Sequence, residues 1–138
     1  MFYLFGGAPI AWQDYVSAHH PPCSALCLLR RKHIGGGAAG EARRVIGEWA
    51  RAFDRLLIHV DVDVIDYADF PIAENTRRHR GLTFRQAMEA IEVLVSAPNW
   101  SALTVAEVNP DHGAADGSTM RMFAQALADA LGRSPVLV

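Results

Sequence analysis

The run LLIHVDVDV, at residues 56–64, is the strongest structural signal in this chain. Its aliphatic and β-branched residues predict a strand, and the near-continuous apolar character is typical of a strand buried on both faces of a parallel sheet. Asp61 and Asp63 interrupt the run two positions apart, so on one strand their side chains would point the same way. The stretch therefore predicts a buried strand that ends in a pair of carboxylates.

Helical periodicity flanks this strand on both sides. Apolar residues recur at helical spacing over residues 41–53, 84–97 and 118–131, and a second strand is expected over residues 102–108. The order helix, strand, helix, strand, helix predicts a right-handed crossover between two parallel strands. The expected fold class is therefore α/β with a parallel sheet.

Local signals mark the ends of two of these helices. Thr83 and Gln86 have the spacing of a capping box, and Pro98 is expected to end the helix that they begin. Gly132 is expected to cap the last helix, and Met122 is among the residues expected to face the core. These signals mark both ends of the second helix and the C-terminal end of the third.

Residues 1–40 are harder to interpret, because glycine and proline pairs interrupt any long element. Residues 2–5 could form a short strand, and residues 24–31 a short strand or a helical turn. We therefore expect a divergent N-terminal segment of unknown role over residues 1–40, followed by an α/β domain over residues 41–138.

Composition excludes several classes of protein. The 138 residues are 51% apolar and include 13 basic and 15 acidic residues, for a formal net charge of −2. A core can form, and a basic excess typical of general nucleic-acid binders is absent. No apolar run reaches the roughly 18 residues of a membrane span, and the first residues make a poor secretory signal. We expect a cytoplasmic protein that binds neither nucleic acid nor membrane.

The carboxylates are the candidate functional residues. Chemistry in a parallel sheet gathers beyond the carboxyl ends of the strands, where Asp61 and Asp63 end one strand and Glu107 ends the next. Two acids so close repel each other, and a bound cation relieves this repulsion. Carboxylate oxygens suit Mg²⁺ or Mn²⁺. His112, beyond Pro110, could also approach this rim.

Other interpretations of the same residues compete with a metal site. An EF-hand loop is rejected, because Ile65 and Asp66 stand where it needs an oxygen ligand and a glycine. A phosphotransferase with Asp61 as nucleophile remains an alternative, although the single lysine, Lys32, lies upstream. In a third interpretation the strand ends before Asp61 and the acids are simply solvated.

Three stretches together resemble the arginase, agmatinase and formiminoglutamase family, the ureohydrolases. Residues 57–66, LIHVDVDVID, are similar to the family's final metal-binding signature. Residues 81–86, GLTFRQ, resemble its Gly-Leu-Thr segment at the start of the next helix. Residues 106–110, AEVNP, resemble the Glu-Val-Asn-Pro end of the following strand. The stretches occur in family order over the last third of a typical member.

The resemblance implies a three-layer α/β/α sandwich and a binuclear manganese hydrolase that cleaves a guanidino or amidino C–N bond by attack of a metal-bridging hydroxide. By position, Asp61 matches the carboxylate that bridges two Mn²⁺ ions, and Asp63 matches one that chelates a single ion. Glu107 matches the acid that pairs with the guanidinium group of a small substrate. A homo-oligomer is also expected.

The sequence departs from the family pattern upstream. The remaining metal ligands and the proton-shuttling histidine of the family belong to stretches that have no counterpart here. The arginase-like fold is therefore expected to be incomplete on its N-terminal side. The alternative function is a non-catalytic fragment or scaffold that self-associates through its exposed sheet. The loop also diverges at residues 70–76, so the choice of substrate stays open. Glu74, Asn75 and the basic stretch over residues 77–80 could line a mouth that selects a carboxylate-bearing substrate, or this loop could simply be solvated.

Overall fold

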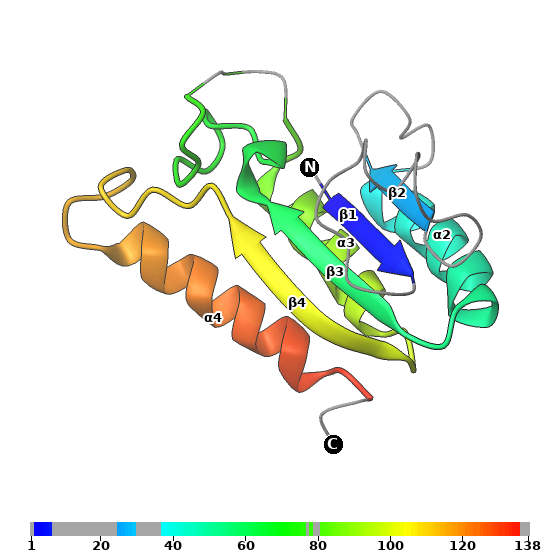
Figure 1. Ribbon diagram of the computed structural model, residues 1–138. Helices are drawn as coiled ribbons and strands as arrows, with labels where there is room; N and C mark the ends of the chain where they lie inside the picture. Colours follow the sequence, from blue (N-terminus) through cyan, green and yellow to red (C-terminus); the bar gives the residue numbers. More distant parts are fainter. Residues whose placement is uncertain (1, 7–24, 30–36, 77, 79–80, 136–138) are drawn as a thin grey trace.

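The computed structural model describes residues 2–6, 25–29, 37–76, 78 and 81–135. Four strands form one sheet in the order β2-β1-β3-β4 (Figure 1). The strands are β1 Phe2–Gly6, β2 Ala25–Leu29, β3 Leu56–Asp61 and β4 Trp100–Ala106. The predicted parallel pairing joins β3 to β4, whereas β1 runs antiparallel to both β2 and β3.

In the described part of the chain, three helices pack with this sheet: α2 Ala38–Ala52, α3 Phe84–Val95 and α4 Ser118–Gly132. In Figure 1, α2 and α3 lie behind the sheet, where they pack against each other, and α4 runs along β4. α3 connects the parallel strands β3 and β4, which is the predicted crossover. The chain thus has the expected α/β fold, with two further antiparallel strands at its N-terminal side.

Burial along β3 alternates, so the strand is not buried on both faces as predicted. Leu56, Ile58 and Val60 are buried beneath the helices, while Leu57, His59 and Asp61 are half-buried on the other face. His59 lies beside Thr104 of β4, with its Nδ1 2.7 Å from the Thr104 hydroxyl. The helices cover one face only of this strand, and Asp61 lies on the more accessible one.

Element boundaries differ from the predicted ones by a few residues. The first helix begins at Ala38 rather than residue 41. β3 ends at Asp61, after which Val62–Val64 form a 3₁₀ turn, η2. Gly132 is the last helical residue of α4 and Arg133 is its C-cap, so the prediction of a capping glycine is wrong.

The prediction that Met122 faces the core is also wrong, because 56% of this residue is exposed. α4 buries Phe123 and Ala130 instead. Its position beside the edge strand β4, packed against α3, leaves a narrower buried stripe than a helix lying across the sheet would have.

The start of α3 confirms the predicted capping box. The Thr83 hydroxyl accepts a hydrogen bond from the Gln86 amide, and the Gln86 side chain accepts one from the Thr83 amide. Phe84 stacks on Phe70, with ring centroids 3.9 Å apart and planes inclined by 9°. This stack packs the loop after β3 against the helix. None of the described helices is long and apolar enough to span a membrane.

Candidate functional site

The parallel pairing of β3 and β4 brings the predicted acids to one edge of the sheet. Asp61, the last residue of β3, pairs in register with Ala106, the last residue of β4. Glu107 is therefore the first residue beyond the strand next to Asp61. We call this edge, with Asp61, Asp63 and Glu107, the carboxylate rim.

Asp63 reaches the rim by a different route from the predicted one. The chain turns out of the strand after Asp61, whose Oδ1 accepts a hydrogen bond of 2.9 Å from the Asp63 amide. Asp61 thus caps the 3₁₀ turn, and buried Val62 and Val64 anchor that turn in the core. Strand alternation does not set the relative orientation of the two half-buried carboxylates; this capped turn does.

A short segment, residues 72–75, crosses from β3 to β4 over the rim; we call it the strap. Its Ala73 forms an isolated antiparallel bridge with Val108. The Glu74 amide donates to the Glu107 carbonyl at 2.8 Å, and the Asn75 amide donates to Oδ1 of Asp63 at 3.1 Å. One continuous segment therefore contacts the last acid of each strand end.

Asn109 and His112, which both follow β4, also form hydrogen bonds with the strap. The Asn109 amide donates to the Ile72 carbonyl at 2.8 Å, and the Asn109 side chain donates to Oε2 of Glu74 at 2.7 Å. His112 places Nδ1 2.8 Å from the Ala73 carbonyl. The sequence motif Glu-Val-Asn-Pro marks Asn109, but nothing in the sequence predicts that its partner lies in the strap.

Glu107 has a strained backbone. Its φ of 61° lies in the left-handed region, and it is the one residue other than glycine with positive φ in the part of the chain that the structure describes. Such a conformation costs roughly 1–2 kcal/mol for a residue with a Cβ. The hydrogen bond from Glu74 to the Glu107 carbonyl helps to hold it. Strain of this kind tends to occur where a side chain must be presented in one direction.

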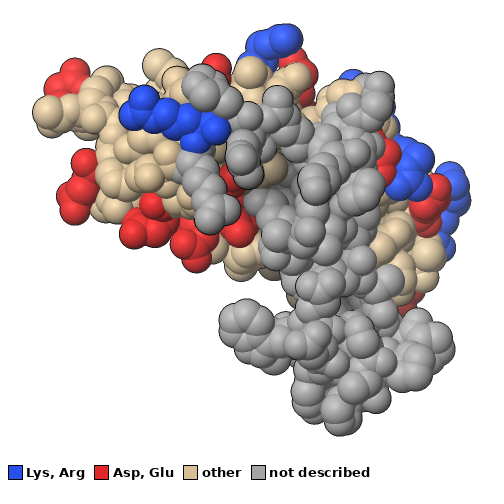
Figure 2. Space-filling model, turned by 90° about the horizontal axis from the view of Figure 1, so that it is seen from above, with Lys and Arg blue, Asp and Glu red and all other residues tan. Residues whose placement is uncertain are grey.

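An aromatic side chain lies against His112, and a cationic side chain lies near that aromatic ring. The rings of Tyr67 and His112 meet edge to face, with centroids 5.4 Å apart and an interplanar angle of 87°. The Arg78 guanidinium carbon lies 5.9 Å from the centroid of the Tyr67 ring. In the view from above, acidic side chains lie along the left and lower-left edge of the molecule and again on the right, with basic side chains near both groups (Figure 2).

The rim offers ligands for a divalent ion in kind but too few in number. Carboxylate oxygens such as those of Asp61 and Asp63 suit a hard ion such as Mn²⁺ or Mg²⁺. Within the described ranges, however, no group of three or more histidine, cysteine, aspartate or glutamate side chains is placed to hold a metal ion. Two carboxylates do not complete the coordination of even one such ion, so further ligands would be needed.

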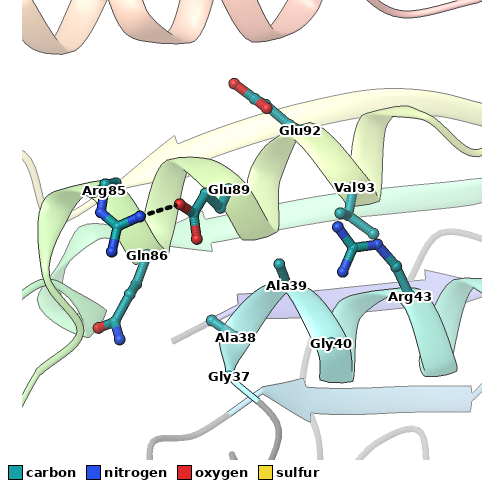
Figure 3. Close-up of a pocket in the computed structure, with 10 residues that line it drawn as sticks. All are labelled: Gly37, Ala38, Ala39, Gly40, Arg43, Arg85, Gln86, Glu89, Glu92 and Val93. Carbon is teal, nitrogen blue, oxygen red and sulfur yellow. Dashed lines mark hydrogen bonds and ion pairs between the residues drawn. The ribbon is translucent and has the colours of Figure 1, made fainter.

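A separate hollow of about 430 Å³ lies between the start of α2 and the outer face of α3 (Figure 3). Arg43 extends toward it from α2, and Arg85 pairs with Glu89 at 2.8 Å along α3. No acid of the rim lines it. The hollow is therefore distinct from the carboxylate rim.

Comparison with known proteins bears on the family and the fold of this chain. Residues 31–132 match the family model described as Arginase family. No curated protein gave a significant match. The family match begins before residue 41, and the strand β1 that precedes it pairs with β3 in the same sheet.

Similar solved structures include two arginases and a formimidoylglutamase. The arginase from Bacillus caldovelox is 23% identical, with a TM-score of 0.60 over 76% of this chain and 33% of its own. The arginase from Bacillus subtilis subsp. subtilis str. 168 is 21% identical, with a TM-score of 0.56 over 72% of this chain and 33% of its own.

Formimidoylglutamase from the same Bacillus subtilis strain is 25% identical, with a TM-score of 0.57 over 69% of this chain and 30% of its own. The chain thus spans about a third of the length of the solved structures that it matches. With its α/β fold, its parallel strands ending in acids and a family match over most of its length, this chain belongs to the arginase family.

Proposed function

We propose that this chain carries the C-terminal part of a ureohydrolase active site, which acts on a small guanidino or amidino compound. In this proposal Asp61 and Asp63 are ligands of Mn²⁺, and Glu107 binds the cationic group of the substrate. One observation supports it most: the three acids follow neighbouring parallel strands, and one strap contacts both strand ends. A cytoplasmic, homo-oligomeric protein remains part of the proposal.

Glu107 suits a planar cation. A guanidinium or amidinium group presents paired N–H donors that match the two oxygens of a carboxylate. The Glu107 side chain is exposed, and its backbone is held by the strap rather than by further strand pairing. Its carboxylate is therefore open to a ligand that approaches the rim.

Asp61 and Asp63 alone do not complete a metal site, so further ligands are needed. When bound, metal ions in a site of this kind lower the pKa of water and so supply a nucleophile at neutral pH. The further ligands would have to come from outside the described residues or from a second polypeptide. The activity of the whole family site is accordingly a proposal for this chain, and an inactive scaffold is the competing one.

Metal content tests the roles of Asp61 and Asp63. The purified chain is stripped with a chelator, reloaded with Mn²⁺, dialysed and assayed by elemental analysis. Because its described ligand set is incomplete, we expect the wild type to retain only part of its Mn²⁺, and Asp61→Ala and Asp63→Ala to retain less. Asp54→Ala is the matched control, because Asp54 is exposed just before the opposite end of β3. Equal metal content in all four proteins would contradict the proposal.

Substrate binding tests Glu107. We expect Glu107→Gln to keep its Mn²⁺ but to weaken binding of arginine or agmatine, measured by calorimetry and, where urea is released, by KM. An effect on metal content alone would contradict the assigned role. A Mg²⁺-dependent phosphatase activity that Asp61→Ala abolishes would instead favour the phosphotransferase alternative.

A further inference from the structure

We infer that His112 is a positioning residue for the carboxylate rim, and that it acts through the strap. The inference rests on the proposed function for the roles of Asp63 and Glu107. The hydrogen bond of His112 goes to the strap, and the strap in turn binds Asp63 and Glu107.

The direction of the hydrogen bond between His112 and the strap follows from its chemistry. The Ala73 carbonyl can only accept, so Nδ1 of His112 carries the proton and donates it over 2.8 Å. The ring is half-buried and packs edge to face on Tyr67. His112 is thus oriented by one aromatic contact and presents a donor to one backbone atom.

If the Ala73 backbone moves, the hydrogen bonds of its neighbours in the strap move with it. The Ile72 carbonyl before it accepts from the Asn109 amide, and the Glu74 amide after it donates to the Glu107 carbonyl. The next amide, that of Asn75, donates to the carboxylate of Asp63. Loss of the His112 donor at Ala73 therefore loosens a segment that holds Asp63 at one end and the strained Glu107 along its length.

The expected size of the effect follows from what outer hydrogen-bond partners do in metal sites. Removal of a group that orients a metal ligand typically lowers metal affinity by about 10–100-fold. His112 is one step further away than a direct partner of Asp63, so we expect the lower end, about 10-fold.

Two substitutions at the same position separate the hydrogen bond from the ring. His112→Phe keeps an aromatic ring for Tyr67 but has no donor, whereas His112→Asn places an amide N–H near the position of Nδ1. The full chain is used for both. Hydrogen exchange of the Glu74 and Asn75 amides reports on the strap, and calorimetric titration with Mn²⁺ reports on the rim.

We expect His112→Phe to exchange both strap amides faster and to bind Mn²⁺ about 10-fold more weakly, and His112→Asn to restore both values. A merely structural contribution of the ring would give the reverse order of the two variants. Unchanged exchange in His112→Phe, or equal defects in both variants, would overturn the inference. Should the wild type bind no Mn²⁺ at all, the proposed function fails, and the exchange rates still decide the role of His112.

Discussion

Gly81 occupies a position that leaves no room for a side chain. A Cβ built there would lie 2.2 Å from the Asp66 nitrogen and 2.5 Å from the Ile65 carbonyl carbon. Two backbone hydrogen bonds of the next residue, Leu82, maintain the close approach: its carbonyl accepts from the Asp66 amide at 2.7 Å, and its amide donates to the Val64 carbonyl at 2.8 Å. This glycine therefore lets the segment before α3 lie directly against the turn that carries Asp63.

We expect Gly81→Ala to destabilise the protein by about 1–3 kcal/mol, because the backbone atoms it meets cannot move without breaking these hydrogen bonds. Urea denaturation followed by circular dichroism measures the change. Gly47→Ala is the matched control: Gly47 lies inside α2, and a Cβ built there would meet nothing within 4 Å outside its own helix, so alanine should stabilise by about 0.5–1 kcal/mol. A neutral Gly81→Ala would show that the two segments are not held this closely in solution.

The sequence predicts that the rim acids lie at one edge of the sheet, but it does not predict how their side chains and backbones are oriented. Asp61 and Glu107 stand out because each follows an apolar strand, and parallel pairing then places them side by side. The orientation of Asp63 depends on a turn that Asp61 itself caps, and a period-two pattern does not contain that turn. The backbone of Glu107 depends on a hydrogen bond from Glu74, far away in sequence.

At the scale of single elements, the starts of α3 and α4 both match the predicted residues, 84 and 118, but a local side-chain signal explains the match only for α3. Its first turn is defined by a local interaction, the reciprocal hydrogen bonds of Thr83 and Gln86. α4 lacks a side-chain cap at its N-terminus, and its boundary residues carry weaker signals. β3 was predicted too long, because Val62 and Val64 are as apolar as strand residues but pack into the core from a 3₁₀ turn.

Thr83→Ala removes the side chain that satisfies the Gln86 amide, and we expect a loss of about 1 kcal/mol in the free energy of unfolding. Thr83→Ser keeps the hydroxyl and should stay close to the wild type. Both are measured by urea denaturation. If Thr83→Ser were as destabilised as Thr83→Ala, the lost methyl contacts rather than the cap would explain the effect.

At the scale of the whole molecule, Ser134 joins the end of α4 to the rest of the core. Its buried hydroxyl accepts from Trp100 Nε1 at 2.7 Å and donates to the Val95 carbonyl at 2.9 Å. One side chain thus connects α4, β4 and the end of α3. This contact fixes the last helix at the edge of the sheet.

We expect Ser134→Ala to destabilise by about 1–3 kcal/mol, because it leaves the buried indole N–H without its acceptor. The nearby Ser101→Ala, at an exposed position, should stay within about 0.5 kcal/mol of the wild type. Thermal denaturation with tryptophan fluorescence compares the two. Equal stability of both variants would mean that water replaces Ser134 as the acceptor.

The arrangement of the complete sheet was only partly accessible from the sequence. The β3-α3-β4 unit follows from periodicity and the handedness of crossovers. The antiparallel strands β1 and β2 join the sheet through pairings of residues at least 19 positions apart, from Gly6 with Ala25 upward, and their short apolar segments carry no signal of direction or partner. The strap was equally hidden, because its hydrogen bonds connect two loops without any repeating pattern.

At position 107, the residue that would best stabilise the fold differs from the residue that the proposed function needs, because the backbone there is left-handed. Glycine there would relieve roughly 1 kcal/mol of strain, yet it would delete the carboxylate proposed to recognise the substrate. If variants of this protein are selected for thermal stability alone, Glu107→Gly should therefore become more frequent. If they are selected for catalytic activity, it should become less frequent. Opposite enrichment of one variant in two parallel screens would be a direct sign that this protein tolerates a less stable fold to keep one side chain in place.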